Sequence, residues 1–242
     1  MTQAAPAVPL SGLLLVDKPA GFTSHDAVAV TRRLLPKKTK VGHAGTLDPT
    51  ATGLLILLIG RATRQANALL KLPKVYAGTA RLGVETETED LEGAVLREAP
   101  VPALSREGLQ ALFNRFLGEV EMPVPKFSAV KHNGKALYKY ARGGLAVPEK
   151  RRVSRIDSWT LTDWTPPEVS FRVRCGSGTY VRSLASLIGR ELGCGGTLSA
   201  LRRESIGEYR VEDAVGVDRV KEFSCGDEAT RFLAERLLAI DA

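Results

Sequence analysis

A glycine-rich loop runs directly into an uninterrupted apolar segment between residues 42 and 60. Residues 54–59 are all leucine or isoleucine, and Gly53 and Gly60 bound them. A run of this kind is typical of a strand buried on both faces or of a short buried helix, and its length and flanking glycines favour the strand. The sequence therefore predicts a central strand that begins where the loop ends.

One carboxylate, Asp48, stands in this loop, which reads GHAGTLDPTATG over residues 42–53. Asp-Pro with nearby glycines is an ordinary turn signature, and most such aspartates only cap a turn. Basic residues flank the loop at 37–40 and at Arg61 and Arg64, so we expect Asp48 to lie in a positive field that favours its ionised form. An ionised aspartate in a basic groove suggests a nucleophile that acts on a polyanion.

The composition is that of a globular chain with an excess of positive charge. The 242 residues are 44% apolar, which is enough for one large or two small domains. The net charge of +7 is consistent with a nucleic-acid partner, although many basic proteins only carry a solvated basic surface. The three cysteines are odd in number and form no C-x-x-C pair, so we expect them to be reduced and structural.

Several classes of protein are disfavoured by the motifs that the sequence lacks. It has no signal peptide and no apolar run near the roughly 18 residues of a membrane span, which predicts a cytoplasmic protein without membrane contact. Its three histidines lack acidic or cysteine partners at ligand spacing, so we expect no metal. It has neither a G-x-x-x-x-G-K-[S/T] loop nor a complete G-x-G-x-x-G fingerprint, so we expect neither a nucleoside triphosphate nor a dinucleotide as a cofactor.

Periodicity and turn residues predict a mixture of strands and helices without strict alternation, which indicates an α+β fold. Ser24 is placed to cap a helix that Pro36 ends. The acidic segment 85–93 is expected to be mobile, and either to face away from a nucleic-acid partner or to move when that partner binds. Other helices are expected at 62–72, 105–117, 136–142, 179–192 and 227–240, and strands at 13–16, 74–82, 151–164 and 169–175, with a hairpin turn at 165–167.

Further blocks extend the pattern around Asp48. They are DKPAGFTS at 17–24, KVYAG at 74–78, VPKFSAVKHNGKALYKYAR at 124–142, SGTYVRS at 177–183 and LRR at 201–203. In order and spacing, these blocks and the loop resemble the TruB family of tRNA pseudouridine synthases, over about residues 13–215. The resemblance implies a catalytic domain at 11–215, built on a mixed, mainly antiparallel sheet with flanking helices and a basic RNA-binding cleft.

The resemblance also indicates what the residues before and after the catalytic domain form. A flexible N-terminus is expected at 1–10, and a short helical extension at 216–242. Many bacterial members of the family continue into a PUA-type RNA-binding domain, and the residues after 215 are too few for a complete one. We therefore expect contacts with the acceptor stem to be reduced or built differently.

The reaction implied by the resemblance converts the T-loop uridine at position 55 of tRNA to pseudouridine. The N1–C1′ bond breaks, the uracil turns, and a bond to C5 forms, with no cofactor. Asp48 is then the nucleophile or charge stabiliser, acting at C6 of the ring or at C1′ of the ribose. The sequence does not distinguish these routes from elimination through a glycal.

The resemblance assigns the other pocket residues as well. Tyr76 would stack on the flipped base, although a tyrosine on a strand more often faces the core. Arg182 would form an ion pair with Asp48, with Tyr180 in the pocket floor and Leu201 as an apolar wall. His43 would enter the RNA loop and fill the space left by the base, although a lone histidine is more often a turn residue.

The expected partner is the T-arm stem-loop of tRNA, bound by a monomer without an obligatory protein partner. Candidate phosphate contacts are Lys18, Arg64, Lys131, Arg202 and Arg203, although most such side chains are only solvated surface. Two alternatives remain: a guide-RNA-dependent relative of the same superfamily, and a non-catalytic tRNA-binding or folding chaperone. Asp48 together with Arg182 favours an enzyme, because an ionised aspartate in a base pocket repels phosphate and has no use in a pure binding module.

Overall fold

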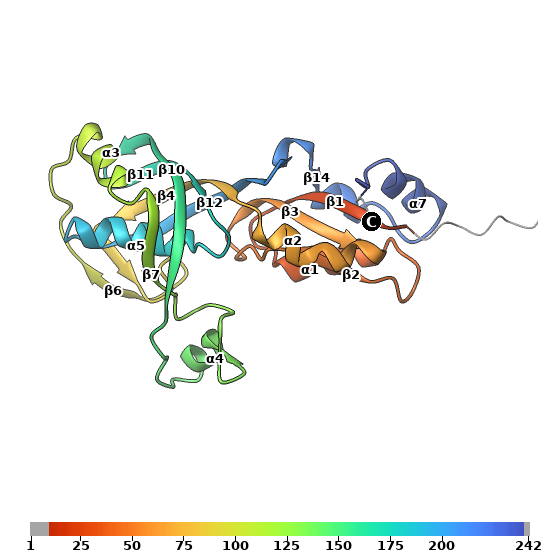
Figure 1. Ribbon diagram of the computed structural model, residues 1–242, viewed down its shortest axis with the longest axis horizontal. Coiled ribbons are helices and arrows are strands. Elements are labelled where there is room, and N and C mark those ends of the chain that lie inside the picture. The colour runs from red at the N-terminus through yellow and green to blue at the C-terminus, as the bar shows by residue number, and fades with distance from the viewer. Residues whose placement is uncertain (1–9, 240–242) are drawn as a thin grey trace, which may run out of the picture. The chain divides into compact units, whose positions relative to one another are not determined.

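A computed structural model describes residues 10–239 of the chain, which form two compact units (Figure 1). The first unit contains the residues up to Leu72 and those from Arg202 onward, and the second contains Pro73–Leu201. The division falls inside one strand, β12 (Gly196–Ile206). The expected N-terminal residues 1–9, and residues 240–242 at the end of the expected last helix and extension, lie outside the described residues.

The sheet of the first unit is built around β3, which is the strand predicted from residues 54–59. Along one edge, β3 pairs antiparallel with β1. Along its other edge, β3 pairs with two strands. Its end pairs antiparallel with β2, where Ile59 is opposite Val41, and its beginning pairs in parallel with β12, where Thr52 is opposite Arg202. β1 also pairs with β14, in parallel. The strands are β1 (Gly12–Lys18), β2 (Val41–Ala44), β3 (Thr52–Ile59), β13 (Tyr209–Arg210), β14 (Val215–Gly216) and the second half of β12.

Helices cover both faces of this sheet, which explains why β3 is apolar on every residue from Leu54 to Ile59. On one face, Leu55 and Leu57 pack with apolar residues of α1, α6 and α7. On the other face, Leu54 and Ile56 pack with Ala62 and Leu69. The helices are α1 (Ser24–Arg32), the 3-10 helix η1 (Gly60–Gln65), α2 (Ala66–Lys71), the 3-10 helix η2 (Val211–Asp213), α6 (Val217–Lys221) and α7 (Asp227–Ala234).

The second unit contains an antiparallel sheet in the order β12-β4-β11-β10-β7, with β12 next to β4. The long hairpin β10–β11 turns at Pro166 and Pro167, as predicted. Two short hairpins, β5–β6 and β8–β9, lie outside this sheet. The strands are β4 (Lys74–Leu82), β5 (Val84–Thr86), β6 (Val95–Glu98), β7 (Gly118–Pro123), β8 (Lys131–His132), β9 (Lys135–Ala136), β10 (Arg151–Thr165), β11 (Glu168–Cys175) and the first half of β12.

Three helices complete the second unit: α3 (Arg106–Asn114), α4 (Leu137–Arg142) and α5 (Val181–Glu191). α3 places Phe113 against Trp159 of β10, with ring centroids 4.5 Å apart, and both rings are buried. α5 comes very close to the chain that follows it, because a Cβ on Gly189 would lie 2.0 Å from the carbonyl carbon of Gly195. Only glycine therefore fits at position 189.

The fold class predicted from the sequence is confirmed: the sheet is mixed and mainly antiparallel, with flanking helices. One difference concerns the residues after 215, where α6 and α7 contribute Val220 and Phe232 to the core of the first unit. The domain limits at 215 and 216 stay a prediction. None of the helices in the described part of the chain is long and apolar enough to cross a membrane.

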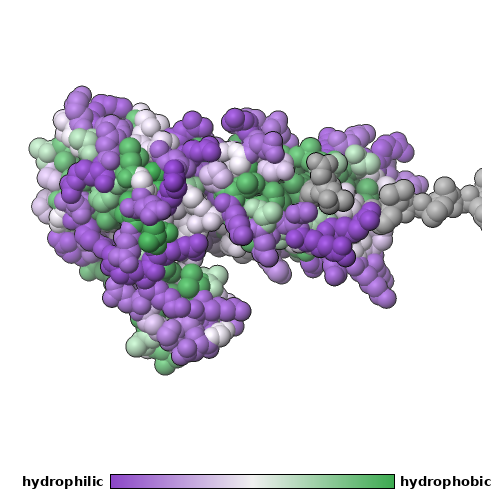
Figure 2. Space-filling view, viewed as in Figure 1, coloured by the Kyte–Doolittle hydropathy of each residue, from purple (hydrophilic) through white to green (hydrophobic). Residues whose placement is uncertain are grey.

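Apolar side chains reach the surface in several places, and the exposed residues Leu91, Val95 and Leu96 lie near one another in sequence. The face drawn in Figure 2 is mainly hydrophilic, with hydrophobic residues in separate places. Leu96 and Val153, both in the second unit, are more than half exposed. Single exposed apolar residues of this kind are normal in folded proteins and do not mark a site.

Candidate active site

The loop that carries Asp48 is held at both of its ends by one buried arginine. Arg203 of β12 donates from Nε to the carbonyl of Leu54 (2.7 Å) and from Nη2 to the carbonyl of Gly45 (3.0 Å). Its side chain is 1% exposed. Gly53 has a φ of +100°, and a Cβ there would lie 2.3 Å from the carbonyl oxygen of Arg203, so the close pairing of β3 with β12 requires glycine.

Ser24 holds the middle of the same loop. Its buried hydroxyl accepts from the amide of Leu47 (2.9 Å) and donates to the carbonyl of Leu47 (3.2 Å). Asp48, the next residue, is half-buried, and its carbonyl accepts from the amide of Ala51 (3.1 Å) in a tight turn. Both polar groups of Leu47 are satisfied by one side chain, which fixes the backbone directly before Asp48.

The expectation that Ser24 caps α1 is wrong by one residue. Thr23 is the N-cap: its hydroxyl accepts from the amide of Asp26, and the Asp26 carboxylate accepts from the amide of Thr23. This reciprocal capping box leaves the hydroxyl of Ser24 available for the Asp48 loop.

Lys18, at the end of β1, supplies a positive charge beside this loop. Its ammonium donates to the carbonyls of Pro19 (2.9 Å), Phe22 (2.7 Å) and Pro49 (3.1 Å), and its side chain is fully buried. Burial lowers the pKa of Lys18 to about 8; Arg203 adds to the shift, while the negative charge of Asp48 opposes it. The phosphate contact expected for Lys18 is therefore corrected, because all three N–H groups bind carbonyls inside the unit.

The positive field expected around Asp48 does not come from the basic residues that flank the loop in sequence. Since Val41 pairs with Ile59, both Lys40 and Gly60 lie at one end of the β2–β3 pair, and the Asp48 loop joins the two strands at the other end. The charges beside the loop come from Lys18 and Arg203, which are far from it in sequence. Proximity in sequence pointed to the wrong cations, because the Asp48 loop is at one end of the β2–β3 hairpin and the flanking basic residues begin at the other end.

His43, on β2, is half-buried opposite Leu57 of β3. Its Nδ1 is buried without a hydrogen-bond partner among the described residues. Burial, and then the charges of Arg203 and His25, lower the pKa of His43, so its neutral form is favoured. The role expected for it in the RNA loop stays a prediction.

In the second unit, Tyr76 and Leu201 lie near the same part of β4. Tyr76 and Gly78 share one face of the strand, and a Cβ on Gly78 would lie 3.5 Å from Cδ1 of Leu201. The side chain of Tyr76 is only 8% exposed, opposite Val173 of β11. Tyr76 is thus a largely buried strand aromatic, and stacking on a base would use the small part of its ring that is accessible.

Arg182, in the first turn of α5, is 5% exposed and is not a surface charge. Its guanidinium donates to the carbonyls of Thr88 (2.7 Å) and Phe127 (3.1 Å) and lies 3.8 Å from the carboxylate of Asp90. Tyr180 is half-buried at the N-cap of the same helix. Because Arg182 and Asp48 belong to different units, the ion pair expected between them stays a prediction.

The acidic segment expected to be mobile is instead tied down within the second unit. Ser183 of α5 donates to the carboxylate of Glu89 (2.8 Å), and the hydroxyls of Thr86 and Thr197 are 2.8 Å apart. Burial raises the pKa of Glu89. Sequence analysis missed Asp90 as a partner of Arg182, because the charges of this segment are typical of a solvated loop.

The remaining candidate phosphate contacts differ in exposure. Arg203 is buried in the Asp48 loop, so its expected phosphate contact is corrected like that of Lys18. Arg202 makes a two-point ion pair with Asp17 (2.7 and 3.1 Å) and keeps part of its side chain exposed. Arg64 on η1 and Lys131 on β8 are exposed.

Comparison with known proteins tests the resemblance to the TruB family. Residues 32–181 match the model of the TruB family pseudouridylate synthase, N-terminal domain. A tRNA pseudouridine synthase B of Opitutus terrae is 46% identical over 212 residues, which cover 88% of this chain and 88% of that protein. One of Burkholderia lata is 45% identical over 237 residues, covering 96% of this chain and 72% of that protein.

Solved structures with a similar fold include chains of two complexes that contain Cbf5 and Nop10. In an archaeal box H/ACA sRNP Nop10-Cbf5 complex, the matching chain is 27% identical with a TM-score of 0.63, over 88% of this chain. In a Cbf5-Nop10-Gar1 complex, the match is 27% identical with a TM-score of 0.65, over 92% of this chain. This chain spans 53% and 59% of the lengths of those two chains.

Proposed function

The chain belongs to the TruB family of pseudouridylate synthases, and on that premise we propose that it isomerises a uridine of tRNA to pseudouridine. The observation that carries this proposal is the Asp48 loop: Arg203, Ser24 and Lys18 bind its backbone at four carbonyls and one amide. So many contacts around one half-buried carboxylate are expected where a reacting group must be held in one geometry. The curated relatives with this activity are 45–46% identical to most of the chain.

We assign the chemistry to Asp48 as the nucleophile or charge stabiliser, which breaks the N1–C1′ bond before C5 of the uracil takes its place at C1′. Lys18 is a positioning residue, since it binds Pro49 directly after Asp48 and attracts the carboxylate. Its amino group has no donor left for the RNA. No cofactor enters the proposal, because the atoms of the base are only rearranged.

The second unit supplies the proposed base pocket. Arg182 pairs with Asp48 in this proposal, and its burial and fixed carbonyl partners support a preorganised guanidinium rather than a solvated one. Tyr76 meets the flipped base with the exposed part of its ring, Tyr180 lies in the pocket floor, and Leu201 forms an apolar wall. His43 fills the space that the base leaves in the RNA.

The proposed substrate site is the T-loop uridine at position 55, within the T-arm of tRNA. Of the phosphate contacts expected from the sequence, Arg64, Lys131 and the exposed part of Arg202 remain after Lys18 and Arg203 are removed. We assign Lys131 and Arg202 to the T-arm, and Arg64 to another part of the tRNA. We further propose that the protein acts as a monomer in the cytoplasm, with no obligatory protein partner. The 46% identity to a tRNA pseudouridine synthase B over most of both chains supports the proposal of a tRNA-modifying enzyme.

The test is tritium release from an unmodified tRNA transcript labelled at C5 of its uridines, since C5 loses its hydrogen when it bonds to the ribose. We expect release of one tritium equivalent per transcript, and none from a matched transcript with cytidine at position 55. Equal release from both transcripts would reject the proposed position. Binding of tRNA with no release from either transcript would reject the enzyme and support the chaperone.

A further inference from the structure

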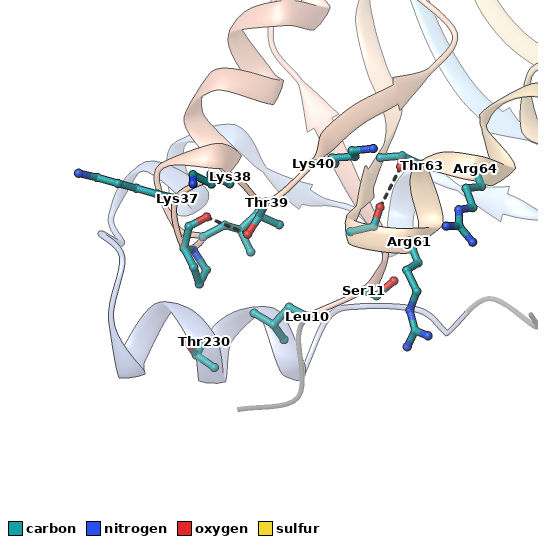
Figure 3. Close-up of a pocket in the computed structure, with 13 residues that line it drawn as sticks. Leu10, Ser11, Lys37, Lys38, Thr39, Lys40, Arg61, Thr63, Arg64 and Thr230 are labelled. Atoms are coloured by element: carbon teal, nitrogen blue, oxygen red, sulfur yellow. Dashed lines mark hydrogen bonds between the residues drawn. The ribbon is translucent and has the colours of Figure 1, made fainter. Parts of the chain in front are cut away.

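A basic pocket lies in the first unit, away from the Asp48 loop. We define it by its five cationic residues, Lys37, Lys38, Lys40, Arg61 and Arg64. Its volume is about 620 Å³, within the range of sites that hold a small molecule or a nucleotide. The lining also includes Leu10, Ser11 and Thr230 of α7 (Figure 3).

Backbone contacts fix the two segments that carry the cations. The turn before β2 is closed by Thr39, whose amide (3.1 Å) and hydroxyl (2.8 Å) both donate to the carbonyl of Pro36. The amide of Gly60 donates to the carbonyl of Lys40 (2.9 Å), which joins this turn to η1. The backbone positions from which the cationic side chains extend are therefore fixed relative to one another.

The two arginines lie on the same side of η1. They are three residues apart, and side chains at that spacing eclipse each other on a 3-10 helix. Figure 3 shows Arg61 and Arg64 extending in the same general direction from η1, whereas Lys37 extends away from the pocket. Both guanidinium groups carry a positive charge on the same side of η1, so an anion bound there would be attracted by both.

The cations of the pocket have no acidic partners in the part of the chain that the structure describes. No carboxylate of residues 10–239 forms a salt bridge with Lys37, Lys38, Lys40, Arg61 or Arg64. By contrast, Arg202 and Arg219 of the same unit are both paired with carboxylates. All five residues of the pocket are exposed, so an anion can reach them.

The pocket is at the opposite end of β3 from the reacting carboxylate. The Asp48 loop ends at Thr52, the first residue of β3, and Gly60 follows its last residue, Ile59. At about 3.3 Å per residue, β3 separates Thr52 from Ile59 by about 23 Å. The η1 residues that follow Gly60 turn back along β2, where a Cβ on Gly42 would lie 4.0 Å from Cγ2 of Thr63. A ligand in the pocket therefore does not reach Asp48 unless it is a long molecule.

We propose that the basic pocket is a second RNA-binding site, which holds backbone phosphates of the same tRNA beyond its T stem. This inference rests on the proposed function, because it takes the T-loop to lie at Asp48. The proposal takes the T stem to run from the Asp48 loop along β3; about five base pairs at roughly 3.4 Å each then span about 17 Å, which is shorter than the strand. Exposed lysines and arginines without acidic partners suit phosphate contacts, which position RNA without reading its sequence.

The experiment compares Arg61→Gln/Arg64→Gln with a matched control, Arg210→Gln/Arg219→Gln, which removes the same charge from exposed positions of the same unit outside the pocket. Equilibrium binding of unmodified tRNA is measured over a series of salt concentrations, beside binding of an isolated T-arm stem-loop. Thermal unfolding of each variant establishes that it is folded.

For the pocket variant, the slope of log affinity against log salt should fall in magnitude by about 1.5 to 2, because each phosphate contact contributes about 0.9. Affinity for tRNA at about 0.1 M salt should fall 10- to 100-fold, and affinity for the isolated T-arm should change less than threefold. The control variant should match wild type with both RNAs.

Three results would overturn the inference: unchanged tRNA affinity in the pocket variant, equal loss with tRNA and the T-arm, or equal loss in the control. A rise in the melting temperature with inorganic phosphate, combined with unchanged tRNA binding, would assign the pocket to a small anion instead. Turnover of the isolated T-arm by the wild-type protein tests the proposed function separately, because that RNA does not need the pocket.

Discussion

Replacing Ser24 with alanine should separate the order of the Asp48 loop from the stability of the helix that Ser24 begins. The buried hydroxyl of Ser24 accepts a hydrogen bond from the amide of Leu47 and donates one to the carbonyl of Leu47. Alanine leaves the helix intact but removes both bonds. The backbone next to Asp48 then loses its attachment to α1.

The size of the effect follows from those two bonds. A hydrogen bond between neutral groups contributes about 1 kcal/mol net, so the variant loses about 2 kcal/mol of the free energy that orders the loop. If catalysis requires the ordered loop, a cost of about 2 kcal/mol corresponds to a fall in kcat of about 30-fold. The cost to global unfolding should be of the same order.

The assay is tritium release at saturating tRNA, with thermal unfolding measured on the same samples. The matched control is Thr23→Ala, which removes the capping box of α1 and costs about 1 kcal/mol of stability without touching Leu47. We expect Thr23→Ala to melt earlier but to keep the wild-type kcat. A Ser24→Ala variant whose kcat lies within twofold of wild type would refute the reasoning.

Three further predictions concern charge and packing. The kcat should decline above about pH 8, because Lys18 then loses its proton and its attraction for Asp48; a pH profile of kcat that is flat from pH 7 to 10 would contradict this. The contribution of Lys18 to the free energy of unfolding should rise between about pH 8 and 10.5, because the unfolded chain binds that proton more tightly than the folded chain does. Arg182→Lys should lower kcat more than tenfold and also lower the melting temperature, since one ammonium does not reproduce the fixed bonds to Thr88 and Phe127; wild-type values for both would show that the fork of Arg182 is not needed. Gly189→Ala should lower the free energy of unfolding by about 3 kcal/mol, because the Cβ of alanine would overlap the backbone of Gly195. An unchanged melting temperature in thermal unfolding would show that α5 and the segment around Gly195 are free to separate.

The sequence predicted the elements whose signal is local. The apolar run before Gly60 specified β3, because a strand covered on both faces needs apolar residues at every position. The two prolines of the β10–β11 turn and the amphipathic pattern of α5 were equally direct. In each case the physical cause lies within a few residues of the signal.

The parts of the candidate site that depend on distant residues were not predictable in the same way. Lys18 and Arg203 are typical surface residues by type, and only the pairing of β1, β3 and β12 buries their charges against carbonyls of the Asp48 loop. The burial of Glu89 depends likewise on Ser183, which is 94 residues away in sequence. The flanking basic residues were assigned to Asp48 by proximity in sequence, and the β2–β3 pairing carries them to the far end.

The most direct measurement of the central claim is tritium release by Asp48→Asn beside wild type, with tRNA affinity measured for both proteins. The substitution keeps the size of the side chain and removes the carboxylate that we propose reacts with uridine. We predict no detectable release by Asp48→Asn, tRNA affinity within threefold of wild type, and the same melting temperature within about 2 °C. Release by Asp48→Asn within tenfold of the wild-type rate would contradict the assignment of Asp48 as the reacting group.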